Sequence, residues 1–507
     1  MKITLASLTR SAAKADLFVA GFFKGEKDLK DLKKIDSAFA KAVETAISKK
    51  RFEGKTGESF SSYQAGYRQA PEMILLGLGE KKDFKVSSLR KAVGSVVAAA
   101  SARKAAKVRV LLDSFLAEEI QGGQAAGVFT EISFLASYRF DKYKAKKKDE
   151  PSKAPESVEL VSENKDELAA MRSAVTRAEK IAKAVLFARE LNNEPGNIMN
   201  PPRLAAEAKK LAAEKKISCK IFGLAELKKL GMNGILAVNQ GSPTPPALVE
   251  LEYGAEYKKN GTVCLVGKGV TFDTGGISIK PSKSMEEMKY DKSGSIAVIA
   301  TMGLVADLRL PLHVVGLTPL AENNVANDPQ RPGDIIKMYN GKTVEVVNTD
   351  AEGRLILADA LSYAKKFEPV AIIDIATLTG MCHHTFGDKT SAVLGNDQKL
   401  VDAFRAAGEK VGERCWQLPL WDEYGDCIKG NQSDLQNVGD GYAGTITAAM
   451  FLKEFVPAKT AWVHLDIAGT GNYSSNKYDC PKGATGFGVR LFTEVLSNWS
   501  PENVSKK

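Results

Sequence analysis

Residues 347–361, VNTDAEGRLILADAL, set two carboxylates and a guanidinium at alternate positions just before an apolar run. The apolar residues have helical spacing, so we expect Asp350, Glu352 and Arg354 to open a helix. Helix capping is one interpretation, because Thr349 and Glu352 have the T-x-x-E spacing of a capping box and acids in a first turn favour the helix dipole. A metal site is the other, because residues two apart in an extended chain share a face. The rest of the sequence decides between them.

A second stretch, residues 264–298, places further charged groups among five glycines, directly after an apolar run typical of a strand. Its charged residues suited to chemistry are Lys268, Asp273, Lys280 and Asp291. A phosphate-binding loop is excluded, because the pattern G-x-x-x-x-G-K-[ST] does not occur here. A glycine-rich turn with solvated charges remains an alternative. If these residues converge with those of the first stretch, however, four carboxylates require countercharge, which two divalent cations would supply.

The sequence also restricts the kind of metal site. It has only four histidines, His313, His383, His384 and His464, and no H-E-x-x-H motif, so the ligands of any metal would be mainly carboxylates. Oxygen-rich sites bind Zn²⁺ and also suit Mn²⁺ and Mg²⁺. The six cysteines show no C-x-x-C spacing, and a disulfide framework is not expected in a chain of 507 residues.

The net charge of +10, from 71 basic and 61 acidic residues, makes nucleic-acid binding a hypothesis to test. Many lysines lie in runs such as KDLKDLKK, which are typical of a solvated surface. No apolar run approaches the roughly 20 residues that span a bilayer, and the first residues lack the ordered regions of a signal peptide. We therefore expect a cytoplasmic protein without a membrane segment.

The elements that must position the charged residues indicate two α/β domains. In residues 1–164, the apolar runs KITLAS, ADLFVAGFF, EMILLGLG, KVRVLLDSF and SVELV predict strands, and residues 87–106 predict a helix. The charged, proline-containing residues 144–157 predict an exposed loop, and residues 165–192 a connecting helix. In residues 193–507, the runs TVCLVG, LHVVGLTPL, VAIIDIATL and AWVHLDIAG predict buried strands. The reactive residues lie at the ends of these strands, where open α/β sheets usually bind ligands.

Several motifs resemble those of the leucyl aminopeptidases, also called cytosol aminopeptidases, a family of metallopeptidases. NTDAEGRL at 348–355 matches the family's signature octapeptide, and VGKGVTFDTGGISIKPS with MKYDKSG resembles its metal-binding motifs. DIATLTG, HLDIAG and GATG follow in the family's order and spacing, so the resemblance spans residues 190–495. The N-terminal third resembles the family in layout and length, and less in motifs. The resemblance favours the metal site over the cap, to which Thr349 and Glu352 can still contribute.

The resemblance implies a ligand set for two divalent metal ions, zinc by family precedent, with one site exchangeable. The first ion corresponds to Asp273, Asp350 and Glu352. The second corresponds to Lys268, Asp273, Asp291 and Glu352. Lys268 can bind a metal only as a neutral amine, so the cation must lower its pKa strongly.

Lys280 and Arg354 match the two catalytic positions of the family. By resemblance, one metal takes the free α-amine of a peptide, and a metal-bridging water attacks the first peptide bond. Lys280 would then polarise the scissile carbonyl, and Arg354 would hold a bicarbonate that serves as the general base. We interpret His464 and Asp466, on an apolar strand, as structural residues or as residues just outside the site.

Four further residues match positions around the family's substrate. Met288 and Thr377 correspond to the pocket for the first side chain, and Leu378 and Gly380 flank the bound backbone. An isolated methionine is more often plain core, and it is the motif around Met288 that favours the pocket. One residue departs from the family, because Lys292 follows the second-metal aspartate where a methionine is common. We expect this charge to be the source of any unusual first-residue preference.

The resemblance implies an α/β fold with a macro-domain-like N-terminal α/β domain (1–164), a connecting helix (165–192) and a C-terminal catalytic domain (193–507) with a mixed sheet flanked by helices. It also implies peptide substrates with leucine or another apolar first residue, and a homohexamer of two stacked trimers. The alternative class is a DNA-binding regulatory protein on the same scaffold, favoured by the basic charge and disfavoured by the lack of a clustered basic helix. A metal-binding pseudo-enzyme is disfavoured because Lys280 and Arg354 are both present.

Overall fold

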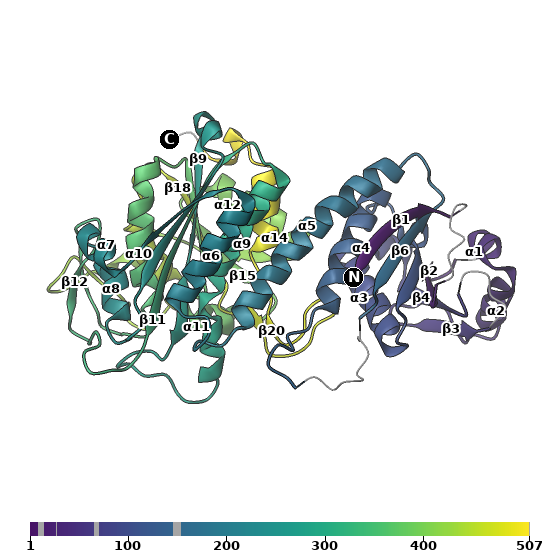
Figure 1. The fold of residues 1–507 in the computed structure, drawn as a ribbon, viewed down its shortest axis with the longest axis horizontal. Helices are drawn as coiled ribbons and strands as arrows, with labels where there is room; N and C mark the ends of the chain where they lie inside the picture. The colour runs from purple at the N-terminus through teal and green to yellow at the C-terminus, as the bar shows by residue number, and fades with distance from the viewer. Residues whose placement is uncertain (9–14, 27, 65–69, 146–153, 506–507) are drawn as a thin grey trace. The chain divides into compact units, whose positions relative to one another are not determined.

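The computed structural model describes residues 1–8, 15–26, 28–64, 70–145 and 154–505. The chain divides into two units, whose elements are labelled in Figure 1. The N-terminal unit consists of Met1–Lys183 with Asn476–Pro481, and the C-terminal unit of Ala184–Ser475 with Lys482–Lys507. Most of the charged loop predicted at 144–157 lies outside the described residues.

The N-terminal unit is built on a six-stranded sheet. In spatial order the strands are β1 (Lys2–Ser7), β6 (Ser157–Ser162), β5 (Lys107–Leu111), β2 (Leu17–Phe23), β4 (Glu72–Gly79) and β3 (Ser59–Tyr63). All neighbours are parallel except β3 and β4. The helices are α1 (Lys30–Ile35), α2 (Ser37–Ser48), α3 (Val86–Ala102) and α4 (Gly122–Ser137). The strands predicted from apolar runs and the predicted helix are confirmed, because central parallel strands such as β2 are buried along their whole length.

The long helix α5 (Leu168–Asn193) runs through the division between the units. A short piece of the last part of the chain, residues 476–481, belongs to the N-terminal unit. It lies close to α3, where a Cβ built at Gly94 would come within 2.8 Å of the carbonyl oxygen of Tyr478. No sequence pattern indicated this insertion.

The C-terminal unit is built on a nine-stranded mixed sheet. Its strands in spatial order are β16 (Cys415–Gln417), β15 (Ser391–Gly395), β18 (Ala461–Asp466), β14 (Ala371–Ala376), β9 (Thr262–Gly267), β11 (His313–Asn323), β8 (Ala247–Tyr253) and β7 (Ser218–Phe222), with β10 (Gly269–Asp273) beside β11. The four central strands, from β18 to β11, are parallel. They are the four strands predicted from the apolar runs, and with them the predicted α/β class is confirmed.

Smaller elements complete this unit. Two small sheets contain β12 (Ile335–Lys337), β13 (Thr343–Glu345) and β17 (Leu435–Gln436), and β19 (Asn472–Tyr473) and β20 (Gly483–Ala484). The helices are α6 (Pro201–Lys215), α7 (Leu224–Leu230), α8 (Asn233–Asn239), α9 (Ser293–Leu308), α10 (Gly353–Tyr363), α11 (Gly380–Phe386), α12 (Gln398–Val411), α13 (Gly444–Lys453) and α14 (Val489–Ser497). Within the described part of the chain, no helix has both the length and the apolar character needed to cross a membrane.

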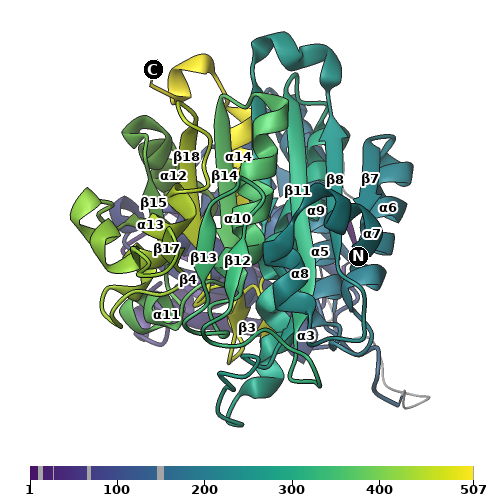
Figure 2. The same ribbon diagram turned by 90° about the vertical axis from the view of Figure 1, so that its left-hand side faces the viewer.

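Helices cover both faces of the large sheet (Figure 2). Val315 and Leu317 of β11 belong to the apolar cluster that contains α10. Gly316 lies between them, and a Cβ built there would meet Val298 and Met302 of α9. Because successive residues of a strand face opposite sides, α10 and α9 lie on opposite faces of the sheet.

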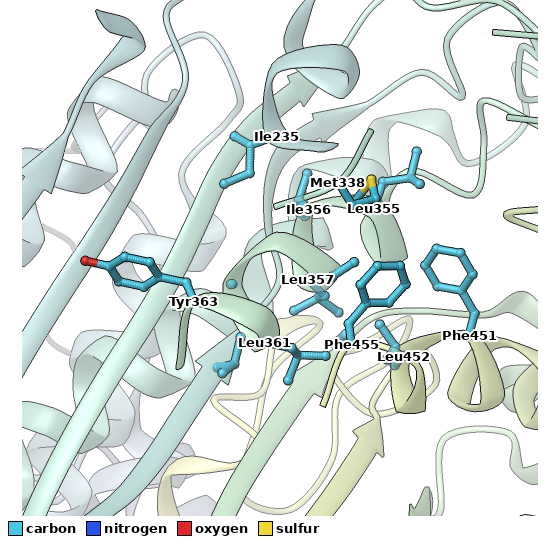
Figure 3. Close-up of a cluster of buried hydrophobic side chains, with 14 of the residues drawn as sticks. Ile235, Met338, Leu355, Ile356, Leu357, Leu361, Tyr363, Phe451, Leu452 and Phe455 are labelled. Carbon is cyan, nitrogen blue, oxygen red and sulfur yellow. The ribbon is translucent and has the colours of Figure 1, made fainter. Parts of the chain in front are cut away.

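All eleven residues of α10 are buried. Leu355, Leu357 and Leu361 pack in a cluster with residues of α8 and α13, part of which is shown in Figure 3. A helix that is buried on every side has no solvated face along which it can shift. The packing of α10 therefore fixes the position of the residues at its N-terminal end.

The start of α10 differs from the prediction. The helix begins at Gly353, so Arg354 lies in the first turn, whereas Asp350 and Glu352 precede it. Glu352 occupies the N-cap position without a side-chain capping bond. The Thr349 hydroxyl donates to the carbonyl of Gly275 instead of capping the helix. The capping box is wrong, because both side chains of the pattern are used elsewhere.

Candidate active site

Several residues selected from the sequence lie at or beside strand ends on one edge of the C-terminal sheet. Lys268 directly follows β9, Asp273 ends β10, and Thr377 directly follows β14. Asp291 lies in a short 3₁₀ helix, η4 (Met285–Lys292), that packs beside β10. Because the carboxyl ends of parallel strands meet at the same edge, residues far apart in sequence converge there.

Lys268 is the cation at the centre of this group. Its buried Nζ lies 2.8 Å from Asp291 Oδ1 and 2.8 Å from Glu352 Oε1. It also donates a hydrogen bond of 2.9 Å to the carbonyl of Thr377. Burial by itself lowers the pKa of Lys268, but the charges of Asp291 and Glu352 outweigh burial and raise the pKa above its usual value. The ammonium therefore compensates two buried carboxylates.

Lys280 provides a second cation opposite the other two carboxylates. Its Nζ lies 2.7 Å from Asp273 Oδ2 and also pairs with Asp350. Burial lowers the pKa of Lys280, and the charge of Asp273 outweighs this effect, so that the group is an ammonium. The other oxygen of Asp273, Oδ1, accepts hydrogen bonds from Gly275 N at 2.9 Å and from Asn323 Nδ2 at 2.8 Å.

The carboxylates have the arrangement of a metal site. One oxygen each from Asp273, Asp350 and Glu352 lie within 4.8 Å of one another. Among the described residues, Asp291 Oδ2 is buried without a hydrogen-bond donor, as is Glu352 Oε1, whose contact with Lys268 lacks hydrogen-bond geometry. Buried carboxylate oxygens without a donor are costly unless a cation completes their surroundings. These residues therefore fit divalent cations held mainly by oxygen.

Metal binding is expected to release protons near neutral pH. Burial and the charge of Glu352 raise the pKa of Asp273 to about 8, and burial raises the pKa of Asp291 to about 6. A metal binds these carboxylates in their ionised form. The affinity of the metal-stripped protein for metal should therefore increase as the pH rises through this range. Calorimetric titration with Zn²⁺ in two buffers of different ionisation enthalpy measures the protons released. Equal apparent enthalpies in the two buffers at pH 7 would contradict this prediction.

Two uncharged residues hold the loops that carry the carboxylates. Asn323, at the end of β11, donates from Nδ2 to Asp273 Oδ1 at 2.8 Å and to the carbonyl of Thr349 at 3.0 Å. The Thr349 hydroxyl donates to the Gly275 carbonyl at 2.6 Å and accepts from Ser278 N at 2.8 Å. Asn323 was not predicted from the sequence. The signal that could have found it is a polar amide at the end of a mostly apolar, buried strand.

Two glycines of the motifs are required by close approach and by backbone conformation. A Cβ built at Gly353 would lie 2.4 Å from Cε of Lys268, so a larger residue would displace the lysine. Gly275 has a φ of +87°, and a Cβ there would lie 2.5 Å from the Ser278 carbonyl oxygen. These glycines let the two polypeptide segments of the site approach each other.

Arg354 lies behind the site and does not line the cavity. Its Nη1 donates to the carbonyl of Asn437 at 2.6 Å, and its buried Nε has no hydrogen-bond partner among the described residues. Burial lowers the pKa of Arg354 to about 10, so the guanidinium is charged at neutral pH. A buried N–H donor of positive charge without a partner fits a small anion.

A cavity of about 330 Å³ opens beside the carboxylates. Its lining includes all four residues expected around a substrate: Met288, Thr377, Leu378 and Gly380. The lining also includes residues that were not predicted from the sequence: Glu287, Tyr290, Thr379, His383, Asp388, Ala468, Asn472 and Ser474. Apart from Arg354, every site residue selected from the sequence lines this cavity.

The side chain of Lys292 points away from the cavity. It is fully buried, and its Nζ donates to the backbone carbonyls of Glu194, at 3.1 Å, and Lys289. Lys292 does not line the cavity, whereas Met288, one turn earlier, does. The expectation that the charge of Lys292 lies beside the substrate pocket is therefore wrong.

The variant Lys292→Met is expected to stabilise the fold. Burial, followed by the charge of Lys289, lowers the pKa of Lys292 from 10.5 to about 7. The Lys292 amine therefore binds a proton more tightly in the unfolded chain than in the folded protein. Wild-type stability should rise as pH increases through this interval. A pKa difference of one unit corresponds to about 1.4 kcal/mol. At pH 7, the free energy of unfolding of the variant should therefore be a few kcal/mol higher than that of the wild type. It should also lack the increase with pH. Denaturant unfolding at pH 7 and pH 9 measures both effects, and the exposed Lys283→Met is the matched control.

The comparison with known proteins agrees with this geometry. The model of the cytosol aminopeptidase family, catalytic domain, matches residues 186–493, and the model of its N-terminal domain matches residues 19–147. The chain belongs to the cytosol aminopeptidase family. It is 42% identical over 496 residues to a probable cytosol aminopeptidase of Geobacter sp., with 98% of this chain and 99% of the relative covered. A similar protein of Syntrophotalea carbinolica is 41% identical, with 98% and 99% covered.

Solved structures with the same fold support the membership of the cytosol aminopeptidase family. The bottromycin maturation enzyme BotP superposes with a TM-score of 0.82 at 32% identity, over 95% of this chain and 99% of that enzyme. Its complex with Mn gives a TM-score of 0.83 at 32% identity, with the same coverage. As a member of the cytosol aminopeptidase family, the chain is a metal-dependent exopeptidase, and the carboxylates described above are its candidate metal site.

Proposed function

We propose that this aminopeptidase releases N-terminal residues from peptides and prefers leucine and other apolar first residues. The observation that carries this proposal is the composition of the cavity. The apolar side chains of Met288, Leu378 and Ala468 line it together with Asp273 and Glu352 of the candidate metal site. An apolar wall next to polar catalytic groups suits a substrate that offers an apolar side chain beside a reacting carbonyl.

The proposed metal ligands follow from the family resemblance and from the cluster of carboxylates. One ion is assigned to Asp273, Asp350 and Glu352. The second is assigned to Lys268, Asp273, Asp291 and Glu352. We propose zinc in both sites by family precedent, and Mn²⁺ and Mg²⁺ also suit an oxygen-rich ligand set. Two bound divalent ions supply a binding position for the free α-amine and a water whose pKa falls toward neutrality.

The chain itself supplies two cationic side chains. One contacts the reacting carbonyl, and the other holds the general base. Lys280, held as an ammonium beside Asp273 and Asp350, donates to the scissile carbonyl oxygen and stabilises the negative charge that develops there. Arg354 offers its unpartnered Nε to a bicarbonate, which we propose as the general base. Leu378 and Gly380 orient the substrate backbone along the cavity wall.

The test is the requirement for a free N-terminus. A peptide that begins with leucine should be trimmed one residue at a time, and its N-acetylated form should be inert, because acetylation removes the amine that binds the metal. A displacement of ~1 Å of the reacting carbonyl costs about a hundredfold in rate. Mass spectrometry of both forms, before and after chelation and with Zn²⁺, Mn²⁺ or Mg²⁺ added back, measures this. Comparable cleavage of the acetylated form, or internal cleavage first, would contradict the proposal.

We also propose a homohexamer in the cytosol. The assembly follows the family resemblance, and the location follows the names of the relatives. Light scattering of the purified protein tests the hexamer, and a stable monomer that retains full activity would overturn it.

A further inference from the structure

Asp466, the last residue of β18, holds two separate loops with one carboxylate. Its Oδ1 accepts hydrogen bonds from Leu378 N and from Ala468 N, both at 3.1 Å. Its Oδ2 accepts from the hydroxyl of Thr379 at 2.6 Å. That hydroxyl is also 2.8 Å from the hydroxyl of Thr445. Asp466 is fully buried and does not line the cavity, whereas Leu378, Thr379 and Ala468 all do.

The loop that contains Leu378 and Thr379 is also held at its other end, by the candidate metal site. The carbonyl of Thr377 accepts from Lys268 Nζ at 2.9 Å, and its hydroxyl donates to Asp291 Oδ1 at 2.6 Å. Residues 377–380 therefore span from the metal site to Asp466. Movement at either anchor changes the distance between this wall and the reacting atoms.

We propose that Asp466 is a positioning residue for the peptide substrate. Its carboxylate fixes the backbone at Leu378 and the hydroxyl of Thr379 against the backbone at Ala468, and so sets the width of the subsite that receives the first side chain. This inference rests on the proposed function, since it assigns a role in substrate selection to a residue that touches neither substrate nor metal.

Asp374 shows what a purely structural carboxylate in the same place looks like. It lies on the neighbouring strand β14, in register with His464, and is equally buried. Its two oxygens accept from Trp462 Nε1 at 2.7 Å and from His464 Nδ1 at 2.5 Å. In the described part of the chain, no residue of the cavity wall donates to it. Asp374→Asn is therefore a matched control for Asp466→Asn.

The variant Asp466→Asn should loosen one part of the wall. An amide oxygen can still accept from Leu378 N and Ala468 N, but the amide nitrogen cannot accept from Thr379. The loop thus loses the hydrogen bond to a charged group that holds its far end, while Thr377 stays on the metal site. A change in the width of the subsite affects the binding of a side chain that fills it more than it affects the binding of a methyl group. One methylene in an apolar pocket changes the discrimination between substrates by about 10–200-fold.

The experiment compares hydrolysis of leucine amide and alanine amide by wild-type protein, Asp466→Asn and Asp374→Asn, each with its metal content measured. In Asp466→Asn, we expect the ratio of kcat/KM for leucine over alanine to fall about tenfold, mainly through KM, with unchanged metal content. Asp374→Asn should lower the unfolding temperature and keep the ratio. The affinities for free L-leucine and L-alanine, measured by calorimetry, should show the same fall in the leucine-to-alanine ratio. This measurement requires no turnover.

Two further variants keep the test decisive if Asp466→Asn does not fold. Thr379→Val removes the hydroxyl and should lower the leucine-to-alanine ratio, and Thr379→Ser should restore it. The proposal is overturned if both Asp466→Asn and Thr379→Val keep the wild-type ratio, or if Asp374→Asn changes it equally. Absence of hydrolysis in the wild-type protein would contradict the proposed function instead, and the affinity ratio for the two amino acids would still decide the role of Asp466.

Discussion

Asp273→Asn and Glu352→Gln are each expected to abolish peptide hydrolysis and to lower the bound-metal content. Both residues are assigned to both metal ions, so each substitution removes a charged ligand from the two sites at once. Mass spectrometry of metals in the purified variants, together with leucine amide hydrolysis, measures the effect. Full activity with two metals per chain in both variants would refute the assignment.

The matched control for these variants is Asp359→Asn. Asp359 is a fully buried carboxylate on α10, and it accepts from the backbone N–H groups of Ile235 and Tyr339 at 3.0 Å. Burial raises the pKa of Asp359 to about 7. An amide can accept only one of these two N–H groups, because its nitrogen is a donor. The variant should therefore lower the unfolding temperature but keep both metals and the activity. Metal loss in this variant as well would indicate a general loss of structure.

Lys280→Met is expected to lower kcat by about 10²–10³ while both metals stay bound. The reason is that one well-placed donor to a developing oxyanion contributes about 2.7–4 kcal/mol. Removal of the ammonium should not weaken metal binding, because its contacts with Asp273 and Asp350 compete with the cations. Steady-state kinetics with leucine amide and metal analysis of the same sample measure the two effects.

Lys283→Met is the control for Lys280→Met, because Lys283 is an exposed lysine in the same segment. It should behave as wild type. A loss of less than tenfold in Lys280→Met, or a loss that is explained by missing metal, would remove Lys280 from the catalytic role.

The strands and the metal site could be predicted from the sequence because their signals are local. An apolar run such as TVCLVG has few alternatives to a buried strand, and the charged residues that follow it must lie at the edge of the sheet. Asp273 was singled out in this way, whereas Asp350 and Glu352 were singled out because they precede an apolar run of helical spacing. Their assignment to a metal site came from the family resemblance, and the structure brings the three carboxylates together.

The features that the sequence missed depend on contacts between distant segments. The T-x-x-E pattern at Thr349 predicts a cap, but Gly275 and Ser278, over seventy residues earlier, take the threonine hydroxyl. Lys292 looks like a charge beside the pocket, yet its side chain reaches the carbonyl of Glu194 in another segment. The role of Asn323 depends on two loops meeting at its amide. Local patterns contain no information about such partners.

The insertion of residues 476–481 into the N-terminal unit has a consequence for synthesis on the ribosome. An N-terminal domain usually folds as soon as it has left the exit tunnel. Here the unit that begins at Met1 lacks a piece of its own structure, including the backbone of Tyr478 that lies against Gly94, until nearly the whole chain has been translated. The N-terminal unit is therefore completed only once residue 481 has been translated, and a truncated product that stops before residue 476 exposes the surface of α3 that this segment covers.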